Sequence, residues 1–266
     1  MRIYIMKVLP ILALLISARC SFAVNLYDGA KPPDGLYFLS NLSHYKSAEN
    51  RNVTETLRLT YYDSLFVGTV LLPVGGLSVK NPDNTNTTAT GVGNLTLGVG
   101  SFLPINKDNQ YNKKFNILPM IFVQFPTRSG FGGNQFGISP QIYFHKITDT
   151  DTYALDVAAK YSYKFRDRDS KVKLGSELSL ESVIGFNIND RMKLGPAVNW
   201  MRREKTQIGG AVIPNTDDSI VSGGLNFLVA VSSVNMEFTY MRDVYTKRTE
   251  KGNFFQFRMM FNIWDK

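Results

Sequence analysis

The stretch that decides the fold is YALDVAAKYSYKF, residues 153–165, in which apolar side chains alternate with small or polar ones. One face of this segment carries Leu155 and Val157, and the other face carries Asp156 and Lys160. A period of two is typical of a β-strand with one apolar and one polar face. A strand of a soluble sandwich usually has about five or six residues, whereas this alternation continues for about thirteen. The length therefore predicts a strand of a membrane-spanning β-barrel.

The same alternation returns in four later segments. They are residues 172–186, 221–231, 234–242 and 255–263. In the last of them, Phe257 and Phe261 stand on the opposite face from Arg258. A chain that ends in a long, aromatic-rich alternating strand is typical of outer-membrane barrels. The repeated pattern predicts an all-β fold, a transmembrane antiparallel β-barrel.

Weaker candidates raise the expected number of strands to about twelve, an even number that lets both ends of a closed barrel lie on the periplasmic side. The expected strands are residues 35–45, 54–62, 64–73, 91–103, 115–125, 135–146, 152–165, 171–186, 191–202, 219–231, 234–244 and 253–264. The shortest links, which should be periplasmic turns, are residues 62–63, 149–151, 187–190 and 232–233. The two longest links, 74–90 and 203–218, then fall outside, whereas the periplasmic link 104–114 is longer than expected.

The N-terminus has the features of a secretory signal peptide. A basic start is followed by an apolar segment at residues 8–16 and by small residues before an expected cleavage site after Ala23. No linker or change of composition divides the chain that follows. We therefore expect residues 1–23 to be removed, residues 24–34 to form a periplasmic lead-in, and residues 35–266 to form one outer-membrane β-barrel.

Composition excludes several classes of protein. Of the 266 residues, 44% are hydrophobic and 20% are charged, which is typical of a folded chain. The one apolar segment that resembles a membrane-crossing helix lies at the N-terminus, so a helical protein with many membrane spans is excluded. One cysteine and two histidines cannot form an internal disulfide or a zinc cage, and no motif predicts a cofactor. The net charge of +8 falls to about +5 without the signal peptide, and no basic patch with interleaved aromatic residues predicts a nucleic-acid partner.

Charged side chains on the polar faces of the strands are assigned to the lumen. The expected lumen-lining charges are Arg58, Asp156, Lys160, Lys164, Lys173, Glu177, Glu181, Lys193, Glu237 and Arg258. A wall with both signs of charge is typical of a water-filled pore, which predicts passive uptake of small solutes. The alternative is a structural or surface-interaction barrel whose interior ion pairs plug the lumen. A third alternative, an outer-membrane hydrolase, needs His44 or His145 as its base; no nucleophile can be assigned beside either, so we expect no enzyme.

Three prolines, Pro119, Pro140 and Pro196, fall inside expected strands, where each removes a hydrogen bond from a ladder. One interpretation of these prolines is a tolerated bulge. Pro119 and Pro140 lie on the adjacent strands 115–125 and 135–146, where both can weaken the same ladder. The second interpretation is therefore a lateral gap, through which a hydrophobic solute leaves the barrel sideways into the membrane.

Three segments carry a family resemblance: GVGNLTLGVGSFLP at 91–104, PMIFVQFPTRSG at 119–130 and NQFGISPQIYF at 134–144. The chain resembles the MetA-pathway phenol-degradation family of outer-membrane channels over most of its expected mature length. Asn94, an expected lumen-lining residue, stands where the family has the aspartate of a Gly-x-Gly-Asp motif, so one lumenal charge is absent. The resemblance implies a β-barrel in the outer membrane of a Gram-negative bacterium that admits small, often aromatic or hydrophobic, compounds. Its expected partners are outer-membrane lipid and a small-molecule solute.

The alternation also predicts which residues face the membrane. Those expected to face lipid are Leu155, Val157, Tyr161, Phe257 and Phe261, and those expected to face the lumen are Asp156, Lys160 and Arg258. Replacing Val157 with Arg near the bilayer midplane should lower the free energy of unfolding by about 2 to 4 kcal/mol, because a charge is then placed in lipid. Labelling of Val157→Cys and Lys160→Cys with a membrane-impermeant thiol reagent checks the register. Ready labelling at position 157 together with none at position 160 would mean that the register is wrong by one residue.

Overall fold

A computed structural model of the chain describes residue 30 and residues 32–81, 85–103, 115–127, 134–148, 150–167, 169–232 and 234–265. In these residues the backbone forms strands and turns, and no helix among them has the length and apolarity needed to span a membrane. The expected signal peptide at 1–23, most of the lead-in at 24–34 and the link 104–114 lie outside the described residues.

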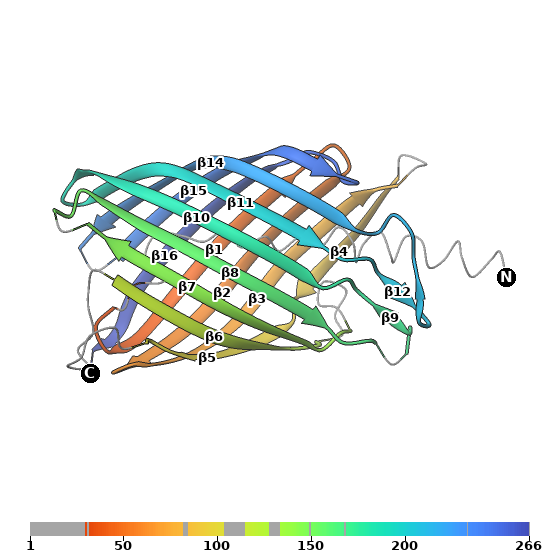
Figure 1. Ribbon diagram of the computed structural model, residues 1–266, viewed down its shortest axis with the longest axis horizontal. Helices are drawn as coiled ribbons and strands as arrows, with labels where there is room; N and C mark the ends of the chain where they lie inside the picture. The colour runs from red at the N-terminus through yellow and green to blue at the C-terminus, as the bar shows by residue number, and fades with distance from the viewer. Residues whose placement is uncertain are drawn as a thin grey trace.

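One antiparallel sheet forms a tilted wall that curls around a central axis (Figure 1). Its strands are β1 (Gly35–Lys46), β2 (Asn50–Asp63), β3 (Phe66–Lys80), β4 (Asn86–Val92), β5 (Leu95–Ser101), β6 (Phe115–Phe125), β7 (Gly137–Ile147), β8 (Tyr153–Lys164), β10 (Glu177–Asn189), β11 (Met192–Arg203), β14 (Asp218–Val231), β15 (Val234–Lys247) and β16 (Asn253–Asp265). Most of these strands begin and end within a few residues of the expected boundaries, because the alternation of side chains ends where the chain leaves the ladder.

The wall closes on itself. β1 pairs with β2 on one side and with β16 on the other, and β2 pairs in turn with β3. β4 and β5 pair with the two halves of β3 on the same side, so they share one place in the wall. The thirteen strands of the sheet therefore occupy twelve places, which confirms the expected closed antiparallel barrel of twelve strands.

The external loop expected at residues 74–90 is instead mostly paired. Residues 74–80 continue β3, and they pair with β4 over residues 86–92. The segment is rich in glycine, asparagine and threonine, so few large apolar side chains mark an outer face. Threonine is β-branched and fits a pleated strand, which explains why the chain forms a hairpin where polarity alone predicts a loop.

A second expected link, 203–218, contains β12 (Gln207–Ile208) and β13 (Ala211–Val212). These strands join β9 (Val172–Lys173) in a small separate sheet beyond the wall, at the right-hand end of the barrel in Figure 1. The strand expected at 171–186 is therefore divided into β9 and β10. Residues 174–176 are the break between them.

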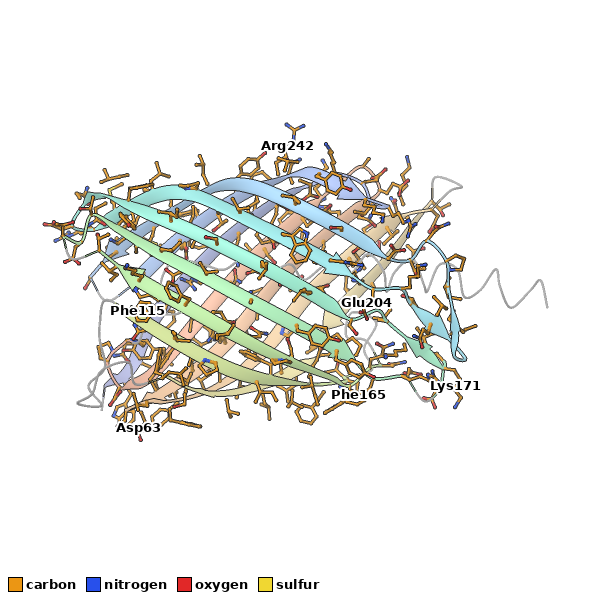
Figure 2. All side chains as sticks on the ribbon, viewed as in Figure 1. Asp63, Phe115, Phe165, Lys171, Glu204 and Arg242 are labelled. Carbon is orange, nitrogen blue, oxygen red and sulfur yellow. The ribbon has the colours of Figure 1, made fainter. Side chains whose placement is uncertain are left out.

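The two faces of the wall differ in chemistry. Large apolar side chains such as Phe238, Phe255 and Leu225 are about half exposed on the outer face, at 47%, 49% and 56%. Side chains project outward around the whole barrel in Figure 2, which labels Phe115 near one end and Phe165 near the other. Phe115 packs edge-on against Phe144 on the neighbouring strand, and near the other end Phe125 packs edge-on against Phe136 and Tyr163 against Phe165. An apolar belt between aromatic girdles is the outer surface that a lipid bilayer requires.

The alternation of β8 and β16 has the register derived from the sequence. Leu155, Val157 and Tyr161 are partly or well exposed on the outer face, and Asp156 between them is completely buried on the inner face. In β16, Arg258 is likewise buried between the outer-facing Phe257 and Met259.

Close approach of neighbouring strands demands glycine at one position of β14. A Cβ atom at Gly224 would lie 1.8 Å from the carbonyl oxygen of Tyr240 in β15, well inside contact distance. The next residue, Gly223, points to the outer face and has no atom within 4 Å of such a Cβ. Of these two adjacent positions, residue 224 therefore has no room for a side chain and residue 223 has room for one.

Replacing Gly224 with Ala should push β14 and β15 apart and lower the free energy of unfolding by about 1 to 3 kcal/mol. The matched control Gly223→Ala should change it by less than about 0.5 kcal/mol, because its methyl group projects into open space. Urea unfolding of each variant refolded into lipid vesicles measures both values. Equal stability of the two variants would contradict the close approach of β14 and β15.

Candidate functional site

Buried ion pairs cross between neighbouring strands on the inner face of β8, β10, β15 and β16. Lys160 Nζ in β8 donates to Glu181 Oε2 in β10 at 2.6 Å, and Arg258 Nη2 in β16 forms an ion pair with Glu237 Oε2 in β15 at 2.6 Å. The Glu237 carboxylate also accepts a hydrogen bond from the Nδ2 group of Asn226 at 2.6 Å. Because these side chains are almost fully buried, each charge is balanced by a partner rather than by bulk water.

A third set of charges lies near the end of the wall that carries the small sheet. Arg203 Nη2 lies 3.0 Å from Glu177 Oε2, and Arg203 Nη1 lies 3.5 Å from Asp218 Oδ2. Arg203 and Asp218 were not among the expected lumen-lining residues. Each of them lies one residue beyond an expected strand, because the expected strands end at residue 202 and begin at residue 219. Strand boundaries are the least accurate part of a sequence-based prediction, so the alternation was not extended to these two residues.

His145 and Asp156 form a buried pair that the sequence analysis did not connect. They are directly opposite each other in the pairing of β7 with β8, and Nδ1 of His145 lies 2.9 Å from Oδ1 of Asp156. Both side chains are completely buried, so this pair is enclosed in the wall rather than presented to a substrate. Knowing which residues of β7 and β8 lie opposite each other would have predicted this pair. That register is set by the length of the turn that joins the two strands, which the alternation alone does not give.

Two expected lumen-lining lysines lie on the inner face with amide partners. Lys164 Nζ donates to Gln124 Oε1 across the strands β8 and β6, and Lys193 Nζ donates to Asn187 Oδ1 near the turn that joins β10 and β11. Among the described residues, no group of three or more histidine, cysteine or acidic side chains is arranged to hold a metal ion.

Asn94 and Lys173 have positions that the alternation did not predict. Asn94 lies in the corner between β4 and β5, where its Oδ1 atom accepts a hydrogen bond from the backbone N–H of Thr127 at 3.2 Å. Lys173 belongs to β9 and not to the wall, and its Nζ lies 4.3 Å from the centre of the outer-facing Tyr163 ring. The expectation that Lys173 lines the lumen is therefore wrong, because the chain leaves the ladder at residues 174–176.

Arg58 is held differently from the other inner-face arginines. Its Nε donates to the hydroxyl oxygens of Thr60 at 3.0 Å and Thr69 at 3.1 Å, which are themselves 2.9 Å apart. Its direct neighbours across the ladder, on β1 and β3, are Leu39 and Leu71. The guanidinium group is therefore held by two threonine hydroxyls, and leucines flank Arg58 on both neighbouring strands.

The inner face of β3 and β6 is apolar over much of its length. Leu118, Met120 and Phe122 point inward from β6 and are 2%, 5% and 5% exposed, and Val67 on β3 is fully buried. Apolar residues were expected to face lipid, so these inward-pointing apolar side chains of β3 and β6 were not predicted. The signal was present in β6, FNILPMIFVQF, which is apolar on both faces and therefore cannot have lipid on one side and a fully polar lumen on the other.

Pro119 and Pro140 act on different ladders. The pairing of β6 with β7 continues unbroken through Pro140. The pairing of β7 with β8 is interrupted at Ser139 and Pro140 and resumes on either side of them. Pro119 faces β5, because the carbonyl of Ile117 two residues earlier accepts a hydrogen bond from Leu103 on that side. Successive residues of a strand bond to opposite neighbours. The expectation that both prolines weaken one ladder is therefore wrong.

These features define the class of protein: a closed antiparallel barrel with an apolar outer face, which is the fold of outer-membrane β-barrels. The chain belongs to the family described as "Putative MetA-pathway of phenol degradation", which matches residues 41–259. This confirms the resemblance seen in the sequence. A comparison with curated proteins finds no match.

Solved outer-membrane proteins share the fold. The COG4313 outer membrane channel from Pseudomonas putida F1 is 14% identical, with a TM-score of 0.77 over 90% of this chain and 99% of that chain. The translocator domain of the autotransporter NalP from Neisseria meningitidis is 9% identical, with a TM-score of 0.55 over 89% of this chain and 90% of that one. The NanC porin is 9% identical, with a TM-score of 0.54 over 85% of this chain and all of that one. At these identities the similarity concerns the fold.

The ion pair between Arg258 and Glu237 gives a test of the inner face. Replacing Glu237 with Ala should lower the free energy of unfolding by about 3 to 5 kcal/mol, because a buried guanidinium then lacks its counter-charge. The double variant Glu237→Leu with Arg258→Met should recover most of that loss, since no charge is left buried. Unfolding in urea compares the three proteins. A double variant as unstable as the single one would mean that packing, and not charge, is what Glu237 supplies.

Proposed function

We propose that the protein is a passive channel of the Gram-negative outer membrane for small solutes with an aromatic or hydrophobic body. The observation that carries the proposal is the contrast between the charged part of the inner face on β8 to β16 and the largely apolar part on β3 and β6. Ligand sites for such solutes combine a mainly apolar surface with a few placed polar groups. Membership of the family and the shared fold of the channel from Pseudomonas putida support the same conclusion.

We further propose that residues 1–23 direct export and that the expected lumen residues Arg58, Lys160, Glu181, Glu237 and Arg258 line the path of the solute. On this proposal the paired charges form a polar track along one side of the barrel. The largely apolar part gives the body of the solute a surface to follow. The alternative function, a structural or surface-interaction barrel with a plugged lumen, predicts the same fold but no conductance.

The candidate lateral exit lies where β7 and β8 are unpaired beside Pro140. An unpaired position is not an opening by itself. Pro196 interrupts the pairing of β10 with β11 in the same way, yet the two backbones remain in contact there, because a Cβ at Gly195 would lie 1.7 Å from the carbonyl oxygen of Ile184. The two interruptions therefore give a matched pair for experiment.

Single-channel recording of the refolded protein tests the channel, and a plugged lumen would give no conductance. Replacing Pro140 with Val should restore hydrogen bonding between β7 and β8, raise the thermal stability and reduce uptake of a hydrophobic solute while uptake of a small hydrophilic one is unchanged. The control Pro196→Val should leave both uptakes unchanged. Equal uptake of the hydrophobic solute by the Pro140→Val variant and the unmodified protein would leave Pro140 as an ordinary bulge.

A further inference from the structure

Among the residues that the structure describes, Arg58 is a cation of the inner face without a counter-charge. Lys160, Arg203 and Arg258 each face a carboxylate within 3.0 Å. In the part of the chain that the structure describes, Arg58 has no acidic partner, and its hydrogen bonds are the two that its Nε makes to Thr60 and Thr69. The terminal nitrogens, Nη1 and Nη2, are therefore left for another acceptor.

The surroundings of Arg58 include, besides the two threonine hydroxyls, apolar side chains and an aromatic ring. Thr69, which holds the Arg58 Nε, has its methyl group 2.7 Å from the position that a Cβ on Gly98 would take, and the Phe122 ring comes within 2.5 Å of the same position. The ring and the threonine methyl thus meet over the Gly98 backbone. Across the ladder, Leu39 and Leu71 flank Arg58 on both sides.

Arg58 is oriented as well as unpaired. The Thr60 and Thr69 hydroxyls lie 2.9 Å apart and fix the Nε edge of the planar guanidinium from the wall side. Arg58 itself is only partly buried, so the rest of the group is reachable. A guanidinium with a free pair of terminal N–H groups matches the two oxygens of a carboxylate in a bidentate geometry. An unpaired charge in apolar surroundings is costly, and binding an anion relieves that cost.

We propose that Arg58 is the recognition site for a monocarboxylate with an aromatic or aliphatic body, which places the carboxylate on the guanidinium and the body against Phe122, Leu39 and Leu71. The inference rests on the proposed channel function for the access of the solute to the lumen. One positive charge matches the single negative charge of a carboxylate. A phosphate with two charges would need a second cation, and the ladder neighbours of Arg58 on β1 and β3 are leucines.

Calorimetric titration of the full-length refolded protein with benzoate and with benzamide tests the site. Benzamide has the same shape as benzoate and no charge. The unmodified protein should bind benzoate at least about tenfold more tightly than benzamide, and Arg58→Gln should remove that preference. Arg58→Lys, which keeps the charge but loses the planar fork, should keep only part of it. The control Arg242→Gln removes the same charge from the exposed outer face and should leave the preference unchanged.

The outcomes separate the site from the channel. Equal binding of benzoate and benzamide by the unmodified protein would overturn the carboxylate site without the need for any variant. Loss of the preference in Arg242→Gln to the same extent as in Arg58→Gln would also overturn it, because general electrostatic attraction would then explain the binding. Binding that depends on Arg58 in a protein without conductance would keep the site and overturn the channel, and conductance without a preference for benzoate would do the reverse.

Discussion

The pairing of backbone N–H and C=O groups around a closed ladder is the constraint on which the rest of the structure depends. Lipid offers no hydrogen bonds, so a strand with an open edge inside the bilayer would leave a row of polar groups unsatisfied. The pairs of β1 with β16 and of β2 with β3 remove such edges. The sharing of one wall position by β4 and β5 has the same origin, since β3 is longer than either and needs a partner along both halves.

Closure then decides the chemistry of the interior. Each strand turns every second side chain inward, so polar residues that cannot face lipid are brought together across neighbouring strands. Glu237 lies directly opposite Arg258, and His145 lies directly opposite Asp156. These pairs are consequences of register as much as of sequence, because a shift by one residue would expose both members to lipid. Arg58 departs from this pattern because its cross-strand neighbours are leucines.

The alternation of side chains in β8 and β16 was enough to predict the barrel and the inner and outer faces of those two strands, and weaker candidates elsewhere in the chain raised the expected number of strands to about twelve. It failed where the pattern depends on more than polarity. The hairpin at residues 74–92 has too few large apolar side chains to mark an outer face, and β6 is apolar on both faces. Lys173 continues an alternating pattern past the point where the chain leaves the wall. Partners such as His145 and Asp156 required the register between two strands, which a single strand's pattern does not contain.

The seam between β1 and β16 has a consequence for the order of folding. Other wall contacts join strands that are close in sequence, whereas the seam joins the two ends of the barrel; Tyr45 of β1, for example, lies opposite Phe254 of β16. The entropy lost in closing a chain segment grows with its length, so local hairpins are cheaper to form than this contact. Non-local pairing slows folding for the same reason, so we expect the seam to form after the local hairpins. Until it forms, β1 and β16 are exposed edges that another chain can pair with.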